Sequence, residues 1–89
     1  MTVVVETTDS ETYIGRYDQE DAAGILLLDA DLHRGAPGET SRAEFLERAA
    51  RLGVWPRLRR VIVPRERVAA VRRLGEIPAA APGGEETPS

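Results

Sequence analysis

The sequence predicts a small, mainly β domain: a five-stranded, strongly bent antiparallel barrel with one α-helix inserted between strands 3 and 4. Short apolar and β-branched runs alternate with turn residues along residues 2–34 and 59–74, as in small antiparallel barrels. A stretch with helical periodicity separates them at residues 41–52. The 89 residues are 42% hydrophobic and only 4% aromatic, which allows one domain with a mostly aliphatic core.

The first three strands follow one another closely. Residues 2–8 read as a strand, and a polar turn leads to a second strand at residues 12–17. Gly15, in the middle of that strand, predicts a sharp bend or a close approach of two backbones. An acidic turn precedes a third strand at residues 24–30. Its continuous Ile-Leu-Leu-Leu run predicts burial on both faces, by the barrel on one side and by the inserted helix on the other.

The inserted helix has clear start and stop signals. Ser41 and Glu44 form a capping box, and Gly53 ends the helix. Glu44 is also spaced to pair with Arg48 on the exposed face. Trp55 follows the helix and is expected to plug the junction between helix and barrel, with an exposed, partner-anchoring role as the alternative. The predicted apolar stripe comprises Phe45, Leu46, Ala49, Ala50 and Leu52.

The last part of the domain admits two interpretations. Residues 60–63 read as a fourth strand. Residues 64–74 have helix signals, with a proline at the start and arginines near the end, but they also fit a tight turn followed by a strand at residues 68–73. We favour the strand. The predicted domain spans residues 1–75, and residues 76–89 are expected to form a disordered tail because they are poor in side chains that pack.

Charge is segregated along the chain although the net charge is only −3. Residues 1–31 contain eight acidic side chains and one arginine, whereas residues 32–74 contain eleven arginines and four glutamates. The simpler interpretation is a mixed, solvated surface. The alternative is an acidic edge that meets a basic edge of another subunit, or a basic surface that meets an anionic ligand. The twelve basic residues are all arginine, which excludes lysine chemistry.

The order of these features resembles the Sm-like family of SH3-like small β-barrels, over residues 2–34 and 59–74. The chain departs from the family because it begins in a strand rather than a helix, and because Ala23 and Gly24 replace the asparagine that helps to hold uracil. Pro64 and Arg65 likewise replace the Arg-Gly pair of the second motif. The first motif is matched by Gly15, Asp21, Ile25, Leu26, Leu27, Leu28, Asp29 and Ala30, and the second in outline by Ile62, Val63, Val68 and Val71.

The resemblance implies a ring-like oligomer more than it implies RNA binding. It places Arg65 and Arg67 in the turn where the family makes nucleotide contacts, and Asp21 near the acid of the first motif. The candidate contacts for nucleic acid or a protein partner are Arg59, Arg60, Arg65, Arg67, Asp21 and Trp55.

Few residues suggest chemistry. The chain has no cysteine and a single histidine. Asp29, Asp31 and His33 have a spacing that could align three metal ligands on one strand face, but such strand ends are more often ordinary polar residues. No nucleophile has an evident base. We therefore expect no catalysis, no metal and no cofactor.

The expected function is that of a non-catalytic Sm-like assembly or interaction domain. It would form a homo-oligomer through its edge strands and could also dock a protein partner. The alternative is a weak RNA-binding module that uses the arginine-rich turn between strands 4 and 5. No run of apolar residues is long enough to span a membrane, so a soluble, cytoplasmic protein without membrane contact is expected.

Overall fold

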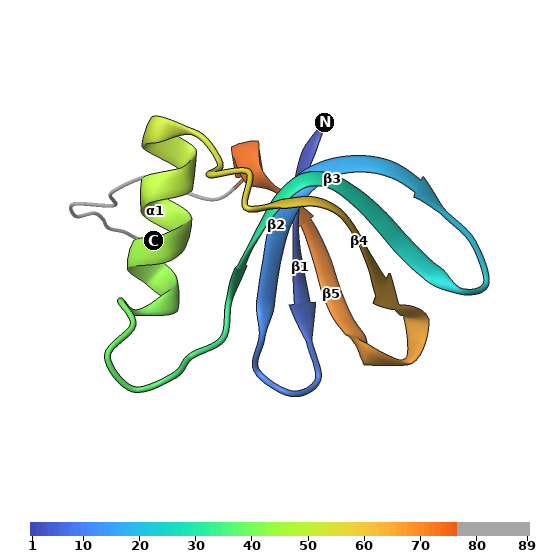
Figure 1. Cartoon of the computed structure of the whole chain (residues 1–89), viewed down its shortest axis with the longest axis horizontal. Coiled ribbons are helices and arrows are strands. Elements are labelled where there is room, and N and C mark those ends of the chain that lie inside the picture. The colour runs from blue at the N-terminus through green and yellow to red at the C-terminus, as the bar shows by residue number, and fades with distance from the viewer. Residues whose placement is uncertain (77–89) are drawn as a thin grey trace, which may run out of the picture.

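The structure is a computed structural model that describes residues 1–76. These residues form one five-stranded antiparallel sheet and one α-helix (Figure 1). The mainly β class and the place of the inserted helix are as predicted. The elements in chain order are β1 (Thr2–Thr7), β2 (Thr12–Glu20), β3 (Gly24–His33), α1 (Arg42–Leu52), β4 (Leu58–Pro64), the 3-10 helix η1 (Arg65–Arg67), β5 (Val68–Arg73) and the 3-10 helix η2 (Leu74–Glu76).

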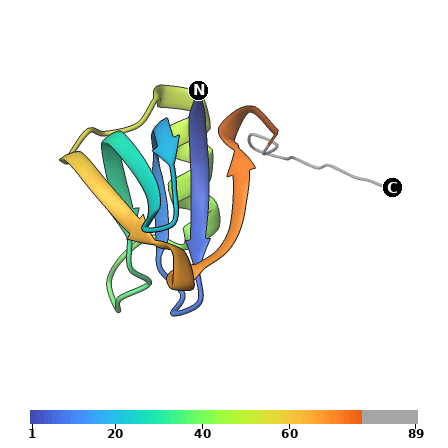
Figure 2. The same ribbon diagram turned by 90° about the vertical axis from the view of Figure 1, so that its right-hand side faces the viewer.

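The strand order is β4-β3-β2-β1-β5, so β4 and β5 are the two edges of the sheet. Figure 2 shows them at opposite margins of the curled sheet. They do not pair with each other, and the five strands form one unclosed sheet instead of a closed barrel. Of the two interpretations of residues 64–74, the strand is correct: η1 makes the turn and β5 follows it. The predicted tail lies outside the described residues, except for Glu76 in η2.

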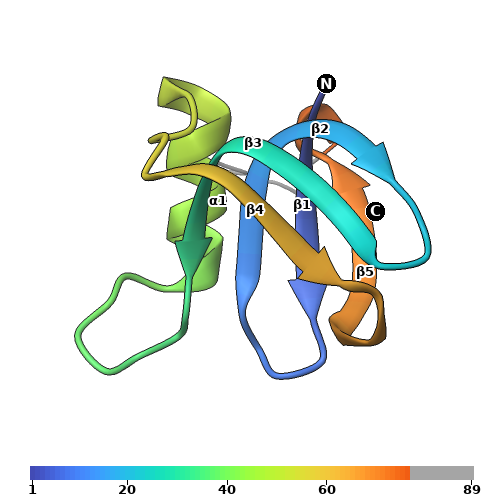
Figure 3. The same ribbon diagram turned by 45° about the vertical axis from the view of Figure 1, so that its right-hand side comes forward.

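A β-bulge in β3 sets the shape of the sheet. Ile14 pairs with Asp31 and Arg16 pairs with Leu28, so two residues of β3 oppose the single residue Gly15 of β2. One of the two is Asp29, which has a left-handed backbone with φ of 50°. A bulge of this kind bends its strand and increases the local twist. Figure 3 shows the result, with β3 and β4 crossing steeply over β1 and β2.

The bulge also reverses the alternation of side chains along β3. Before it, Ile25 and Leu27 face the inner core; after it, Ala30 and Leu32 do. Without the extra residue, the odd-numbered positions would have continued to face inward. The inner core consists of Val3, Val5, Tyr13, Ile25, Leu27, Ala30 and Val63, with Tyr17, Leu32, Leu58, Val61 and Val68 packed against it.

Gly15 lies where the two strands come closest, as the sequence predicts. A Cβ atom at this position would lie 2.7 Å from the Cβ of Ala30 and 3.2 Å from the carbonyl oxygen of Leu28. Ala30 is itself fully buried. The position therefore excludes any side chain unless the bulge moves.

The helix begins and ends as predicted. Ser41 accepts a hydrogen bond from the Glu44 amide, the Glu44 side chain reaches back to the Ser41 amide, and Gly53 closes the last turn with φ of 95°. Because Glu44 is used in this cap, the predicted pair with Arg48 does not form. Arg48 has no hydrogen-bonded or ionic partner among residues 1–76.

Two expectations about the helix are wrong. α1 packs on β1 and β2, through Leu46 and Ala49 against Val4 and Ile14, and the Ile-Leu-Leu-Leu run of β3 is not part of this contact. The reason is the bent sheet, which turns the first half of β3 away from the helix. The predicted stripe is also narrower than expected, because Leu52 is 72% exposed. The partly buried residues packed against this second core are Phe45, Val54 and Leu74.

We predict that Gly15→Ala lowers the free energy of unfolding by about 1–3 kcal/mol, because the new methyl group overlaps the Ala30 side chain. Gly15→Val should cost more. The double variant Gly15→Ala with Ala30→Gly removes the overlapping methyl group and should recover part of the loss. Urea unfolding of the wild type, Gly15→Ala, Ala30→Gly and the double variant measures this coupling. If the double variant loses as much free energy of unfolding as the two single variants together, the contact is contradicted.

A second stability prediction concerns the helix. Leu46→Ala should destabilise the domain by about 2–5 kcal/mol, because Leu46 is buried between α1 and the sheet. Leu52→Ala, on the same helix but exposed, should change the free energy of unfolding by less than about 0.5 kcal/mol. Thermal or denaturant unfolding of both variants checks the difference. Similar losses in the two variants would show that the helix packs on another face.

Candidate functional site

The predicted contact residues in the turn between β4 and β5 are held by acidic residues of the same chain. Arg65 donates to the Glu20 carboxylate at 2.8 Å and to the main-chain carbonyl of Asp21 at 2.6 and 3.0 Å. Asp21 uses its own side chain to cap the β2–β3 turn, where it accepts from the amide of Ala23 at 2.8 Å. Arg65 and Asp21 are thus brought together, in a bond that ties two turns to each other.

Arg67 is bound more firmly. Its guanidinium donates to Asp9 at 2.8 and 3.0 Å and to Glu11 at 2.6 Å. These hydrogen bonds raise the pKa of Arg67 above its usual value. The pKa of Asp9 is lowered, first by the hydrogen bond that the Thr7 hydroxyl donates and then by Arg67. The cluster connects η1 to the β1–β2 turn and fixes the edge of the sheet near β5.

The acidic first third of the chain and its basic middle third meet inside the molecule. The ion pairs that show this are Arg57–Asp31, Arg65–Glu20, Arg67–Asp9, Arg67–Glu11 and Arg72–Glu6, each of which joins an arginine of the basic block to an acid of residues 1–31. Their side chains are partly exposed, so each pair contributes modestly to stability. Arg59 and Arg60 lie exposed on β4, away from these clusters.

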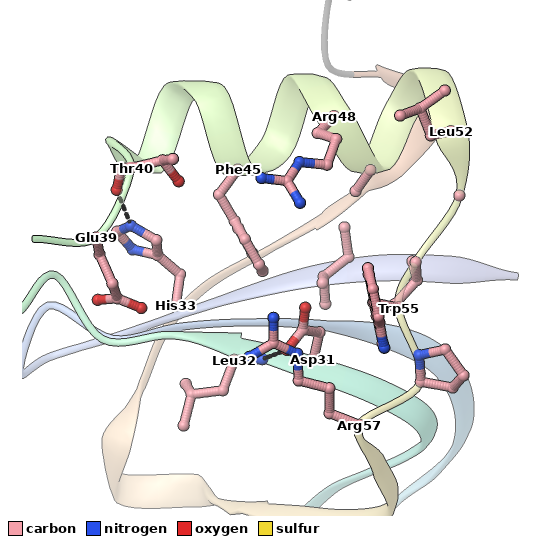
Figure 4. Close-up of a pocket in the computed structure, with 15 residues that line it drawn as sticks. Asp31, Leu32, His33, Glu39, Thr40, Phe45, Arg48, Leu52, Trp55 and Arg57 are labelled. Atoms are coloured by element: carbon pink, nitrogen blue, oxygen red, sulfur yellow. Dashed lines mark hydrogen bonds and ion pairs between the residues drawn. The ribbon is translucent and has the colours of Figure 1, made fainter.

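A cleft of about 640 Å³ lies below α1, and we call it the α1 cleft. Figure 4 shows Trp55 at one end and His33 at the other, with Phe45 and Arg48 reaching in from the helix and Arg57 from the opposite side. The floor comes from the second half of β3 and from β2. The lining residues are Ile14, Asp31, Leu32, His33, Glu39, Thr40, Phe45, Arg48, Ala49, Leu52, Gly53, Val54, Trp55, Pro56 and Arg57.

Trp55 does not plug the junction between helix and sheet, because it is 64% exposed. The connection from α1 to β4 runs over the outside of the sheet and keeps the indole at the rim of the α1 cleft. The guanidinium of Arg57 lies 5.6 Å from the centre of the indole ring. Arg57 is in turn 3.6 Å from the carboxylate of Asp31, a residue only 8% exposed. A buried acid therefore positions a cation, and the cation lies against an exposed aromatic ring.

His33 is a structural residue at the other end of the cleft. Its Nε2 lies 2.5 Å from the carbonyl oxygen of Thr40. Because a carbonyl only accepts, Nε2 carries the proton and donates, which ties the loop before α1 to the end of β3. The ring lies 5.2 Å from the ring of Phe45. Its Nδ1 and the hydroxyl of Thr12, its paired residue on β2, are both buried without a hydrogen-bond partner.

Asp29, Asp31 and His33 do not share a strand face. The bulge turns Asp29 outward, where its carboxylate pairs with Arg16 at 3.2 Å, while Asp31 and His33 line the α1 cleft. Among residues 1–76, no group of three His, Cys, Asp or Glu side chains could hold a metal ion. None of the helices in this range has the length and apolar character of a membrane span.

Sequence reasoning selected Trp55 but missed the residues that surround it. Arg48 and Arg57 belong to no recognisable sequence motif. The spacing of Asp31 and His33 suggests only metal ligands. Trp55 and Arg57 are two positions apart in the sequence, which is a signal that an aromatic ring and a cation can lie together. The position of Asp31 beneath them depends on the bulge, which no local pattern predicts.

Comparisons with protein-family models, with curated proteins and with solved structures found no match for this chain. The Sm-like resemblance therefore rests on the sequence motifs alone.

The lowered pKa of Asp9 predicts how the turn cluster responds to acid. A carboxyl whose pKa is lower in the folded state stabilises that state above its ordinary pKa of about 4, and loses this contribution as the pH falls through the folded value. Wild type should therefore melt at a higher temperature than Asp9→Asn at pH 7, and the difference should disappear in strongly acidic buffer. Melting curves over this range test the sign. A difference that grows in acid would mean that the Asp9 contacts do not favour the carboxylate.

Proposed function

We propose that this chain is a non-catalytic, Sm-like assembly domain that self-associates by pairing the edge strand β4 of one copy with the edge strand β5 of the next. The observation that carries the proposal is the pair of open edges. β4 has seven residues and β5 has six, with a register shift near the start of β5. Each strand exposes a large apolar side chain. Ile62 on β4 is 51% exposed and Val71 on β5 is 44% exposed.

The hydrogen-bond alternation gives the direction of the free backbone groups. In β1 the odd-numbered residues bond β2, as the Tyr17 amide bonds the Met1 carbonyl. Its even-numbered residues therefore face β5, where Val4 pairs with Arg72. It follows that the backbone N–H of Arg72 points toward β1 and that the backbone N–H of Val71 points to the open edge.

The same alternation applies to β4. The Arg65 amide bonds the Ala23 carbonyl, so the odd-numbered residues of β4, such as Val63, face β3. Ile62 then directs its N–H to the open edge. Pro64 falls on the same outward side, where a missing N–H costs no bond within the sheet. Within residues 1–76, each copy thus offers two different edges whose outward donors bond no other strand, which invites pairing with a neighbour.

Pairing between two different edges is head-to-tail. Such contacts form rings when the rotation between copies closes, and filaments when it does not. The strong bend of the sheet rotates β4 relative to β5, which favours a closed ring over a flat, open array.

Weak RNA binding through the β4–β5 turn is the alternative, and the contacts of the turn count against it. Arg65 and Arg67 would have to leave Glu20, Asp9 and Glu11 before they could meet phosphates. Those acids would then repel the nucleic acid. Arg59 and Arg60 remain exposed, but two arginines account for a log–log salt slope of only about −1.4 on a single strand.

We predict that the wild type sediments as a multimer and that Val71→Pro shifts it toward monomer. Proline removes the outward N–H of β5 and leaves the bonds to β1 intact, so the variant should remain folded by circular dichroism. Ile62→Lys, on the other edge, should have the same effect because a charge opposes edge pairing. Arg72→Pro is the matched control, since its N–H faces β1 and its loss should unfold the sheet. A wild type that stays monomeric at high concentration excludes the proposal.

A further inference from the structure

We propose that the α1 cleft is a binding site for a small organic anion whose carboxylate or phosphate is attached to a flat ring system. This activity goes beyond self-association and does not depend on it, because the cleft lies below α1 and not along the outer edge of β5. The cleft has the size of a ligand site, exposed apolar groups, and an arginine, Arg48, that has no partner among residues 1–76.

The cleft has the dimensions and lining of a ligand site. Its volume of about 640 Å³ lies within the range of about 300–1,000 Å³ that is usual for small-molecule pockets. Phe45 and Val54 contribute apolar surface to its walls, and Trp55 and Leu52 stand exposed at its rim. Two large apolar side chains left in water beside one cleft mark it as a place where an apolar body is buried.

The lining of the cleft holds two acids and two arginines, but these four side chains do not all pair with one another. Asp31 is compensated by Arg57 at 3.6 Å. Glu39 accepts from the amides of Ala36 at 2.7 Å and Arg34 at 3.4 Å, which lowers its pKa and directs its charge to the loop. Arg48, which reaches into the cleft in Figure 4, has no partner among residues 1–76. The unpaired guanidinium of Arg48 selects an anion, because a guanidinium binds carboxylate and phosphate groups through two parallel hydrogen bonds.

The exposed indole of Trp55 selects the shape of the apolar part of the ligand. Asp31, which is almost fully buried, holds Arg57, and Arg57 lies 5.6 Å from the centre of the indole ring. An aromatic surface at the rim of the cleft binds flat rings by stacking or edge contact. The ligand then spans the cleft from Trp55 to Arg48.

The single tryptophan of the chain makes the site directly observable. Anilinonaphthalene sulfonate, a flat aromatic anion, serves as the probe, because its absorption overlaps tryptophan emission. We expect one dye to bind per folded chain with energy transfer from Trp55. Naphthoate should displace it if the site takes carboxylates, and adenosine monophosphate if it takes phosphates. The neutral counterparts, naphthamide and adenosine, should displace it at least about tenfold less well, since they lack the charged hydrogen bonds.

Matched helix variants test the role of the charge. Arg48→Gln should weaken dye binding about tenfold, the effect of one charged hydrogen bond, whereas Arg51→Gln, which removes an exposed charge outside the lining, should leave it unchanged. Both variants should keep the wild-type melting temperature. The proposal would be overturned if Arg48→Gln left dye binding unchanged, or if charged and neutral competitors displaced the dye equally well. Either result would show non-specific binding to an apolar surface. Absence of dye binding would also overturn the proposal.

The same titration on Val71→Pro separates the two proposals. A variant that has become monomeric but still binds the dye supports the site independently of assembly. Loss of dye binding in the folded monomer would show that the cleft needs a neighbouring copy, and would overturn the single-chain site proposed here.

Discussion

The close contact between Gly15 and Ala30 at the β3 bulge is the constraint on which the rest of the structure depends. Two residues of β3 oppose one glycine of β2, and the strand can make this step only because Gly15 has no side chain. The bulge bends the sheet and reverses the side-chain alternation of β3. Apolar residues continue to fill the inner core on both sides of it, while Asp31 and His33 turn to the opposite face. Core and cleft are therefore consequences of the same local irregularity.

Part of the charge that is segregated along the chain is neutralised by ion pairs within one molecule. Arginines from the turn and from β5 return to acids of β1, β2 and the turns that follow them, as in the pairs Arg67–Asp9 and Arg72–Glu6. This arrangement stabilises the contact between chain ends that are far apart in the sequence. It also means that sequence blocks of one sign do not become surfaces of one sign. Arg48 is one of the arginines without an acidic partner among residues 1–76, and its predicted partner Glu44 is occupied in the helix cap.

The open edges and the α1 cleft occupy different parts of the molecule. Ile62 and Val71 lie on the two margins of the sheet, while the cleft is built from α1, the connection after it and the end of β3. A domain of this size buries a limited core, and an edge that pairs with another copy adds to it. The proposed assembly and the proposed ligand binding would therefore use separate surfaces.

The sequence alone determined the elements of this protein. Alternating strand residues, the Ser41–Glu44 capping box and the close approach at Gly15 are local signals, and the structure confirms each of them. Tertiary structure decided the rest. Asp29 adopts a left-handed backbone, a conformation that aspartate tolerates. The neighbouring sequence contains no signal that predicts it. That single conformation sends Asp31 to the cleft and keeps Asp29 out of it. The exposure of Trp55 and the partners of Arg65 and Arg67 likewise depend on the path of the bent sheet, because they join segments that lie far apart in the chain and meet only when it folds.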